Sequence, residues 1–528
     1  MRSTRNRRGF LGDVGRGMIV ATVGSSVASD LGLSIALAGD GDDNRLAFGA
    51  LEPLVAIMQE SAPDRLVAAV VEKIQGGTDL KTLVAAAALA NARTFGGEDY
   101  VGFHTLMAMA PAYAMSRELP AEQQALPILK VLHRNTNRLH EVGGSSKEVL
   151  HQVAPDDGIC CEDGGEVLRD AVRSKDMNAA ERTFAALAQG KPSEAFDALL
   201  YAVQDNTEVH RTVLPYRAWD LLSLVGPEHA HTLLRQSVRY CVKSERDWNH
   251  NAELDRPRTL LPKLLDQYAL IGKPLGTRAV DDQWVERTSK AIFEANADQA
   301  AEIAAAALAE GIAPDAVGEA ISIAANQLVL RDAGRSAREV QPNKPVGSVH
   351  GDSIGVHACD SANAWRNMAR HSGPRNTFAC LILGAYQMAN DRVQRGGDFL
   401  NWTPRPSGEA LEGVAKLDDP ASLVQDLDRA IQANEQERAC ALVHRFASLG
   451  QSERPVLDVL LRFATSEDGA LHAEKYYRTV CEEFAATRPA FRWRQIVALA
   501  RVTASEFGRK APGVDEACER LGVRIAAR

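Results

Sequence analysis

The chain has 528 residues and a formal net charge of -9. Hydrophobic residues make up 45% of the chain and aromatic residues 5%, so it can bury a large core, and its alanine-rich segments favour helices over sheets. The net negative charge argues against a nucleic-acid partner, which would require a basic surface.

The first predicted element is an N-terminal leader, residues 1–38. Four arginines lie between Arg2 and Arg8, and the segment 6–11 resembles the twin-arginine export signal. The apolar run from Gly17 to Ala28 is too short to act as a stable membrane anchor. The resemblance implies that the export machinery carries the folded protein to the periplasm. The alternative is a disordered basic tail on a cytoplasmic protein.

Beyond the leader, apolar residues recur at helical spacing along the chain. Segments 51–60 and 64–75 predict a helical hairpin, and a third helix runs over 80–92 after Thr78 or Asp79 as the cap. Further helices are predicted over 121–141 and within 281–331. Because no run of alternating polar and apolar residues predicts strands, we expect an all-α fold in which helical hairpins pack around a central cavity.

Four histidines occupy similar places in four of the predicted hairpins. Each follows an apolar helix and a polar turn, and each opens a second helix. Segments 168–222 and 427–484 resemble each other, and the segments 80–115 and 317–368 share the pattern Gly-[Phe/Val]-His-[Thr/Ala]. This pattern indicates divergent duplication, with two histidine units in residues 39–255 and two in residues 256–528. The four histidines are His104, His210, His357 and His472.

Apolar residues follow each of these histidines at helical spacing, so each histidine begins a face that points inward. Equivalent positions in stacked units can converge, and three or four imidazoles suit a divalent iron, copper or zinc ion. We therefore predict the four histidines as metal ligands. The alternative is that each ring packs in the core and satisfies a buried carbonyl group. Carboxylates near the histidines could orient the rings; they are Asp99, Glu208, Asp352, Asp360 and Glu474.

The segment 349–357 holds two further candidates, His350 and Asp352. We expect them to supply another metal ligand or a catalytic base, although Asp352 or Ser353 could instead cap the following helix. The segment also fits the pattern G-x-S-x-G, but a serine nucleophile elbow needs a parallel sheet, which the sequence does not predict. Long irregular segments at 333–348 and 397–420 flank this unit, and such loops often form the walls of a site.

Arg217 or Arg478 follows the histidine of its unit by about two turns, and we predict that one of them binds an anionic group of the substrate. The Gly-[Phe/Val]-His-[Thr/Ala] segments at His104 and His357, and the segments at His210 and His472, resemble the questin oxidase-like family. That resemblance implies an all-helical protein that uses oxygen chemistry. The sequence thus predicts an exported metal-dependent oxidoreductase acting on a small-molecule substrate; the alternative is a helical-repeat scaffold that binds protein without catalysis.

Overall fold

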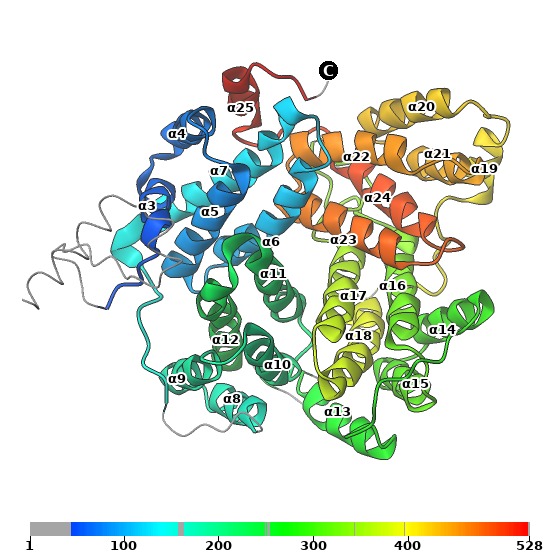
Figure 1. Cartoon of the computed structure of the whole chain (residues 1–528). Helices are drawn as coiled ribbons and strands as arrows, with labels where there is room; N and C mark the ends of the chain where they lie inside the picture. Colours follow the sequence, from blue (N-terminus) through cyan, green and yellow to red (C-terminus); the bar gives the residue numbers. More distant parts are fainter. Residues whose placement is uncertain are drawn as a thin grey trace, which may run out of the picture.

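The computed structural model describes residues 44–156, 163–248, 250, 254–342, 344–394 and 397–525. Within these ranges the regular structure is helical, and strand-like pairing is limited to isolated bridges. The prediction of an all-α fold is therefore confirmed (Figure 1). The predicted leader, residues 1–38, lies outside the described residues, so its interpretation as an export signal stays a prediction.

The N-terminal half begins with the predicted hairpin and continues through two histidine units. Asp79 caps α5 as predicted, because its side chain accepts the N–H of Thr82. The helices are α3 (Glu52–Glu60), α4 (Pro63–Gln75), α5 (Leu80–Phe95), α6 (Tyr100–Ser116), α7 (Ala125–Val142), α8 (Gly164–Arg173), α9 (Met177–Leu187), α10 (Pro192–Val203), α11 (Val209–Val225) and α12 (Ala230–Asp247).

The described part of the C-terminal half is also helical, and the segment 281–331 forms three helices. The helices are α13 (Arg256–Gln267), α14 (Asp282–Glu294), α15 (Ala297–Ala309), α16 (Pro314–Arg331), α17 (Ile354–Arg370), α18 (Pro374–Gln394), α19 (Gly408–Val414), α20 (Pro420–Gln432), α21 (Gln436–Ser448), α22 (Arg454–Ser466), α23 (His472–Ala486), α24 (Trp493–Glu506) and α25 (Val514–Leu521).

The same arrangement of helices recurs in the two halves. In the first, α6 packs against α5, α7 and α11; in the second, α17 packs against α16, α18 and α23. The halves also exchange contacts, because α11 packs against α17 while α23 packs against α6. Figure 1 shows these four helices in the middle of the molecule, between the blue and green helices of the first half and the yellow and orange helices of the second. An internal duplication produces such repetition.

The shared glycine of the Gly-[Phe/Val]-His-[Thr/Ala] segments has a packing role. A Cβ atom on Gly355 would lie 2.6 Å from the backbone nitrogen of Val329 on α16, and one on Gly102 would lie 2.5 Å from the ring of Phe95 on α5. Glycine therefore lets each of these histidine helices lie close against the helix before it. Pro111 and Pro215 lie inside α6 and α11, which continue past them.

We expect Gly355→Ala to lower the free energy of unfolding by about 1–3 kcal/mol, because the added methyl group can be accommodated only by moving α17 away from α16. Urea unfolding followed by circular dichroism measures the change. Gly413→Ala is the matched control, since a Cβ there meets nothing within 4 Å. Equal stability of Gly355→Ala and the wild type would contradict this account of the motif.

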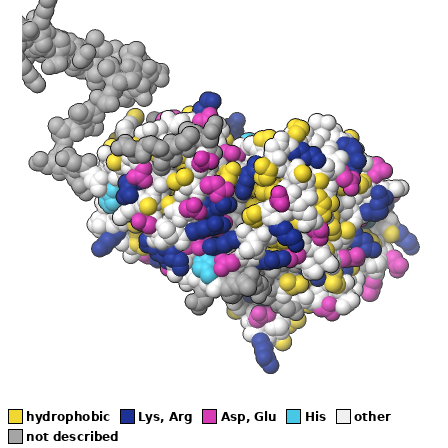
Figure 2. Space-filling model, turned by 90° about the horizontal axis from the view of Figure 1, so that it is seen from below, with side chains coloured by type: hydrophobic (Ala, Val, Ile, Leu, Met, Phe, Trp, Pro, Cys, Tyr) yellow, Lys and Arg dark blue, Asp and Glu magenta, His cyan; other side chains and the backbone are white. Residues whose placement is uncertain are grey.

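The helices enclose one continuous apolar core that runs through both halves. On the face shown in Figure 2, basic and acidic side chains are interspersed. None of the helices in the described ranges has the length and apolar character that a membrane crossing requires.

Candidate functional site

The four predicted histidines come together where the two halves meet. The Nε2 atoms of His104 and His210 are 3.2 Å apart, and those of His357 and His472 are 3.3 Å apart. Across the two pairs, ring centroids are separated by 5.3 Å between His104 and His472 and by 6.1 Å between His210 and His357. The rings thus form a closed group of four, in which each imidazole lies beside two others.

Hydrogen bonds to Nδ1 fix the orientation of the first pair. The Nδ1 atom of His104 lies 2.7 Å from the carbonyl oxygen of Tyr100, and since a carbonyl can only accept, this nitrogen carries the proton. The Nδ1 atom of His210 lies 2.5 Å from a carboxylate oxygen of Glu208. A neutral ring that carries its proton on Nδ1 presents an Nε2 lone pair to the other ring. Two lone pairs that face each other repel unless a proton or a cation lies between them.

Burial keeps two of the rings neutral. His104 and His472 are 3% and 4% exposed. Burial, followed by the nearby charge of Lys475, holds the pKa of each well below the usual range of histidine. Lys475 lies one turn after His472, and burial lowers its pKa to about 8 against the opposing charges of Asp360 and Glu474. Neutral imidazole is the form that binds metal ions.

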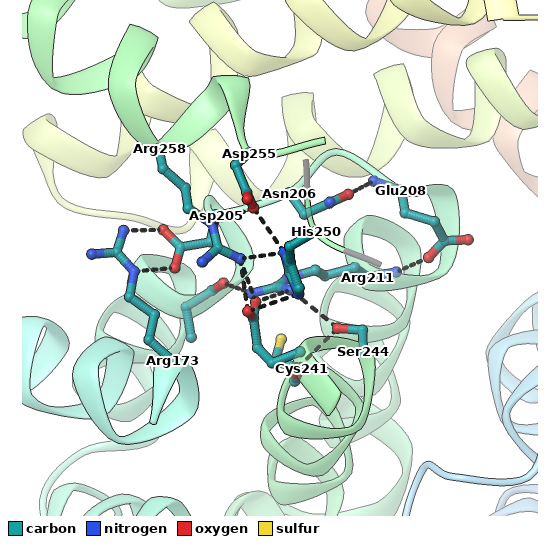
Figure 3. A network of polar contacts seen from close by, with 12 residues as sticks. Arg173, Asp205, Asn206, Glu208, Arg211, Cys241, Ser244, His250, Asp255 and Arg258 are labelled. Atoms are coloured by element: carbon teal, nitrogen blue, oxygen red, sulfur yellow. Dashed lines mark hydrogen bonds and ion pairs between the residues drawn. The ribbon is translucent and has the colours of Figure 1, made fainter. Parts of the chain in front are cut away.

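The turn before His210 is held by hydrogen bonds on both sides (Figure 3). The side chain of Asn206 accepts the N–H of Glu208 at 2.8 Å, and the Glu208 carboxylate accepts the N–H of Arg211 at 3.0 Å. The buried guanidinium of Arg211 pairs with Glu245 at 2.9 Å. Burial acts to raise the pKa of Glu208, but His210 and the backbone N–H groups hold it at about 2. Glu208 is therefore ionised and can orient His210.

Cationic side chains hold the turn before His472 in place. Arg134 and Arg509 both pair with the buried carboxylate of Asp468, at 3.2 and 3.3 Å. The Lys130 ammonium donates to the carbonyl oxygens of Ala464 and Glu467, at 2.8 Å each. The two acidic turns recognised in the sequence thus place the two histidines that follow them.

The carboxylates predicted near the histidines have different roles. Glu208 bonds to His210, whereas Asp99 caps α6 by accepting the N–H of Gly102 at 2.8 Å. Asp360 accepts the hydroxyl of Thr479 at 2.7 Å, and Glu474 pairs with Lys130 at 2.6 Å. Glu208 therefore contacts one of the four clustered histidines directly.

Each histidine pair has the spacing of two ligands on one ion. Two nitrogen ligands at about 2.0–2.1 Å from a tetrahedral metal lie about 3.3–3.4 Å apart, close to the observed 3.2 and 3.3 Å. The four rings nevertheless stand as two pairs. Across the described part of the chain, no three or more His, Cys, Asp or Glu side chains form a group that could hold a metal ion. A single ion shared by both pairs would require the pairs to move closer together.

Two cavities flank the histidine cluster. The larger, about 550 Å³, is lined by His210, His357, Tyr100 and Asp352 among others, and we call it the His210 cavity. The smaller, about 310 Å³, is lined by His104 and His472 and also reaches Tyr100 and Asp352; we call it the His472 cavity. The internal duplication relates the two cavities, because each lies between the starts of α6 and α17 and next to one of the two acidic turns.

The other predicted site residues lie in different surroundings. His350 and Asp352 form an ion pair and both line the His472 cavity. Arg217 and Arg478 line neither cavity. Arg217 is buried, and both guanidinium groups pair with the same carboxylate, Glu482, at 3.3 and 2.6 Å. Both guanidinium groups thus face a carboxylate within the helix packing, and their assignment to the substrate stays a prediction.

Sequence reasoning did not single out several residues at the site. Lys475 lies three positions after His472, and that helical spacing was the available signal. Tyr100 offers its carbonyl group and Tyr240 donates its hydroxyl to Glu208 at 2.8 Å. The Tyr100 contact is local, since His104 lies four positions later on the same helix. The Tyr240 contact depends on how α11 and α12 pack, so spacing along the chain does not indicate it.

Comparison with known proteins gives one partial similarity. The chain is 38% identical to Methyltransferase AacuQ from Aspergillus aculeatus over 74 residues, which is 14% of this chain and 22% of that protein. No family model matches the chain, and no solved structure matches it. The resemblance to the questin oxidase-like family therefore stays a prediction, and the short match carries no activity over to this chain.

Proposed function

We propose that this protein is a metal-dependent oxidoreductase whose four clustered histidines hold a divalent iron, copper or zinc ion. One observation supports the proposal above all: the Nε2 atoms of His104 and His210 face each other at 3.2 Å while their Nδ1 atoms are engaged by Tyr100 and Glu208. Such a contact is repulsive between neutral rings and becomes favourable when a proton or a cation lies between them. The oxidative part of the proposal rests on the family resemblance.

The residues around the cluster have separate tasks in this proposal. A bound transition metal would supply a Lewis acid and, for iron or copper, a redox centre. Glu208 keeps the Nδ1 proton on His210 and so directs its Nε2 lone pair to the ion. Asp352 borders both cavities and pairs with His350, which places this pair where it can accept or return a proton.

We assign the small-molecule substrate to the His210 cavity. Its volume of about 550 Å³ lies within the range of small-molecule sites. The aromatic rings of Tyr100, Trp248 and Tyr386 line it, so it offers flat apolar surfaces beside His210 and His357.

Metal analysis of the purified protein tests the proposal. We expect about one iron, copper or zinc ion per chain in the wild type and none in the double variant His104→Ala/His472→Ala. Adding metal at about 100 times its Kd should stabilise the wild type by about 2.7 kcal/mol and leave the double variant unchanged. His140→Ala, which removes an exposed histidine on α7, is the matched control and should bind metal like the wild type.

Two outcomes would count against the proposal. A wild type that binds no metal, with variants as stable as itself, would favour the helical scaffold. A protein that binds zinc alone, and whose iron- or copper-treated forms give no redox-dependent electron paramagnetic resonance signal, would contradict the oxidoreductase assignment while leaving the metal site intact.

A further inference from the structure

The His472 cavity differs from the His210 cavity in the charges that line it. Four cationic side chains line the His472 cavity: Arg134, Arg335, Lys344 and Arg509. The described residues that line the His210 cavity include no lysine or arginine, but they include the carboxylates Glu208, Asp352 and Asp391. The His472 cavity also has three carboxylates, Asp352, Asp468 and Glu506, so its four cations outnumber them by one, whereas the described lining of the His210 cavity has carboxylates without a lysine or arginine.

The three carboxylates that line the His472 cavity are all paired, and Asp352 pairs with His350. Lys344 pairs with Glu506 at 2.6 Å, and Arg134 and Arg509 share the single carboxylate of Asp468. Two guanidinium groups on one carboxylate leave an excess positive charge.

Arg335 adds a further positive charge to this cavity. Its Nε atom is buried and has no hydrogen-bond partner in the described part of the structure. No ion pair joins its guanidinium to a carboxylate among the residues placed there either. The guanidinium lines the cavity, and an oxyanion is the acceptor that fits a guanidinium best.

An inserted segment brings this arginine to the cavity. Four residues, 96–99, connect α5 to α6, whereas 22 residues, 332–353, connect the equivalent helices α16 and α17. The longer segment supplies Arg335, Lys344 and His350. Two hydrogen bonds join this segment to the end of α24. The N–H of Val349 donates to the Ser505 hydroxyl at 3.0 Å, and the N–H of Gly351 donates to Glu506 at 2.8 Å.

We propose that the His472 cavity binds an oxyanion, the carboxylate or phosphate group of a small molecule, through the guanidinium of Arg335. The excess charge at Arg134 and Arg509 attracts the anion, and the planar fork of Arg335 can bind two of its oxygens. A cavity of about 310 Å³ admits a small acid and leaves the larger His210 cavity to a different molecule. The anion site holds whether or not the histidines bind a metal, so the two proposals can fail separately.

Titration with inorganic phosphate and with succinate tests this site, and the two probes distinguish a phosphate from a carboxylate. Binding is measured calorimetrically at constant ionic strength set with sodium chloride, on the protein as purified and after treatment with a chelator. We expect saturable binding of at least one probe in both preparations. Arg335→Gln should weaken it by at least about tenfold, because the charge and the paired donors are lost.

Two further variants make the test specific. Arg338→Gln removes an exposed arginine from the same segment and should bind like the wild type. Arg335→Lys keeps the charge without the planar fork and should recover part of the affinity. Absence of saturable binding in the wild type, or equal binding by Arg335→Gln and Arg338→Gln, would overturn the proposal.

Discussion

Glu208→Gln is expected to weaken metal binding by about 10–100-fold, with little change in the fold. Glu208 is the carboxylate that holds the Nδ1 proton on His210, at 2.5 Å. A glutamine has no charge, and its amide group can donate to Nδ1 and shift the ring proton to Nε2. That proton would occupy the lone pair that faces His104. Competition titration against a coloured chelator measures the affinity.

Tyr240→Phe is the matched comparison for this variant. The Tyr240 hydroxyl donates to the other oxygen of Glu208, at 2.8 Å, so its loss leaves the contact between Glu208 and His210 in place. We expect a smaller loss of affinity than in Glu208→Gln. If Glu208→Gln bound metal as tightly as the wild type, the carboxylate would have no part in orienting His210.

Glu483→Ala is expected to lower the free energy of unfolding by about 3–5 kcal/mol, because it leaves a buried guanidinium without its counter-charge. Arg366 on α17 and Glu483 on α23 pair at 2.7 Å, and their side chains are 3% and 2% exposed. The pair joins the two helices that carry His357 and His472. Chemical denaturation measured by fluorescence and circular dichroism gives the change.

Two controls separate this effect from a general loss of packing. Glu286→Ala removes half of an exposed pair with Arg494 and should cost about 0–1 kcal/mol. The double variant Arg366→Leu/Glu483→Leu removes both buried charges and should recover much of the stability lost by the single variant. A single variant no less stable than Glu286→Ala would show that the buried pair does not hold α17 to α23.

The all-α fold and the meeting of the four histidines could both be predicted from the sequence. Helical periodicity predicted the helices, and the place of each histidine at the start of its second helix predicted convergence. Both follow from local patterns: Asp79 caps its helix through its own side chain, and Gly355 marks a close helix contact. Such signals lie within a few residues of the feature that they determine.

The parts of the site that depend on distant contacts could not be predicted in this way. Arg217 and Arg478 have the expected place along their helices, but both face Glu482, and no spacing rule indicates that partner. The difference in charge between the two cavities arises where the segment 332–353 folds back onto α24. Arg335 and Arg134 are 201 positions apart in the sequence and meet at one cavity because the two halves pack together.

An anomalous-scattering map from a crystal grown with the metal that the purified protein contains tests the central claim most directly. The account predicts one peak among His104, His210, His357 and His472, with at least three of their Nε2 atoms at about 2.0–2.2 Å from it. A map without a peak there, or with the metal bound at another place on the chain, would contradict the claim that these four imidazoles form one metal site.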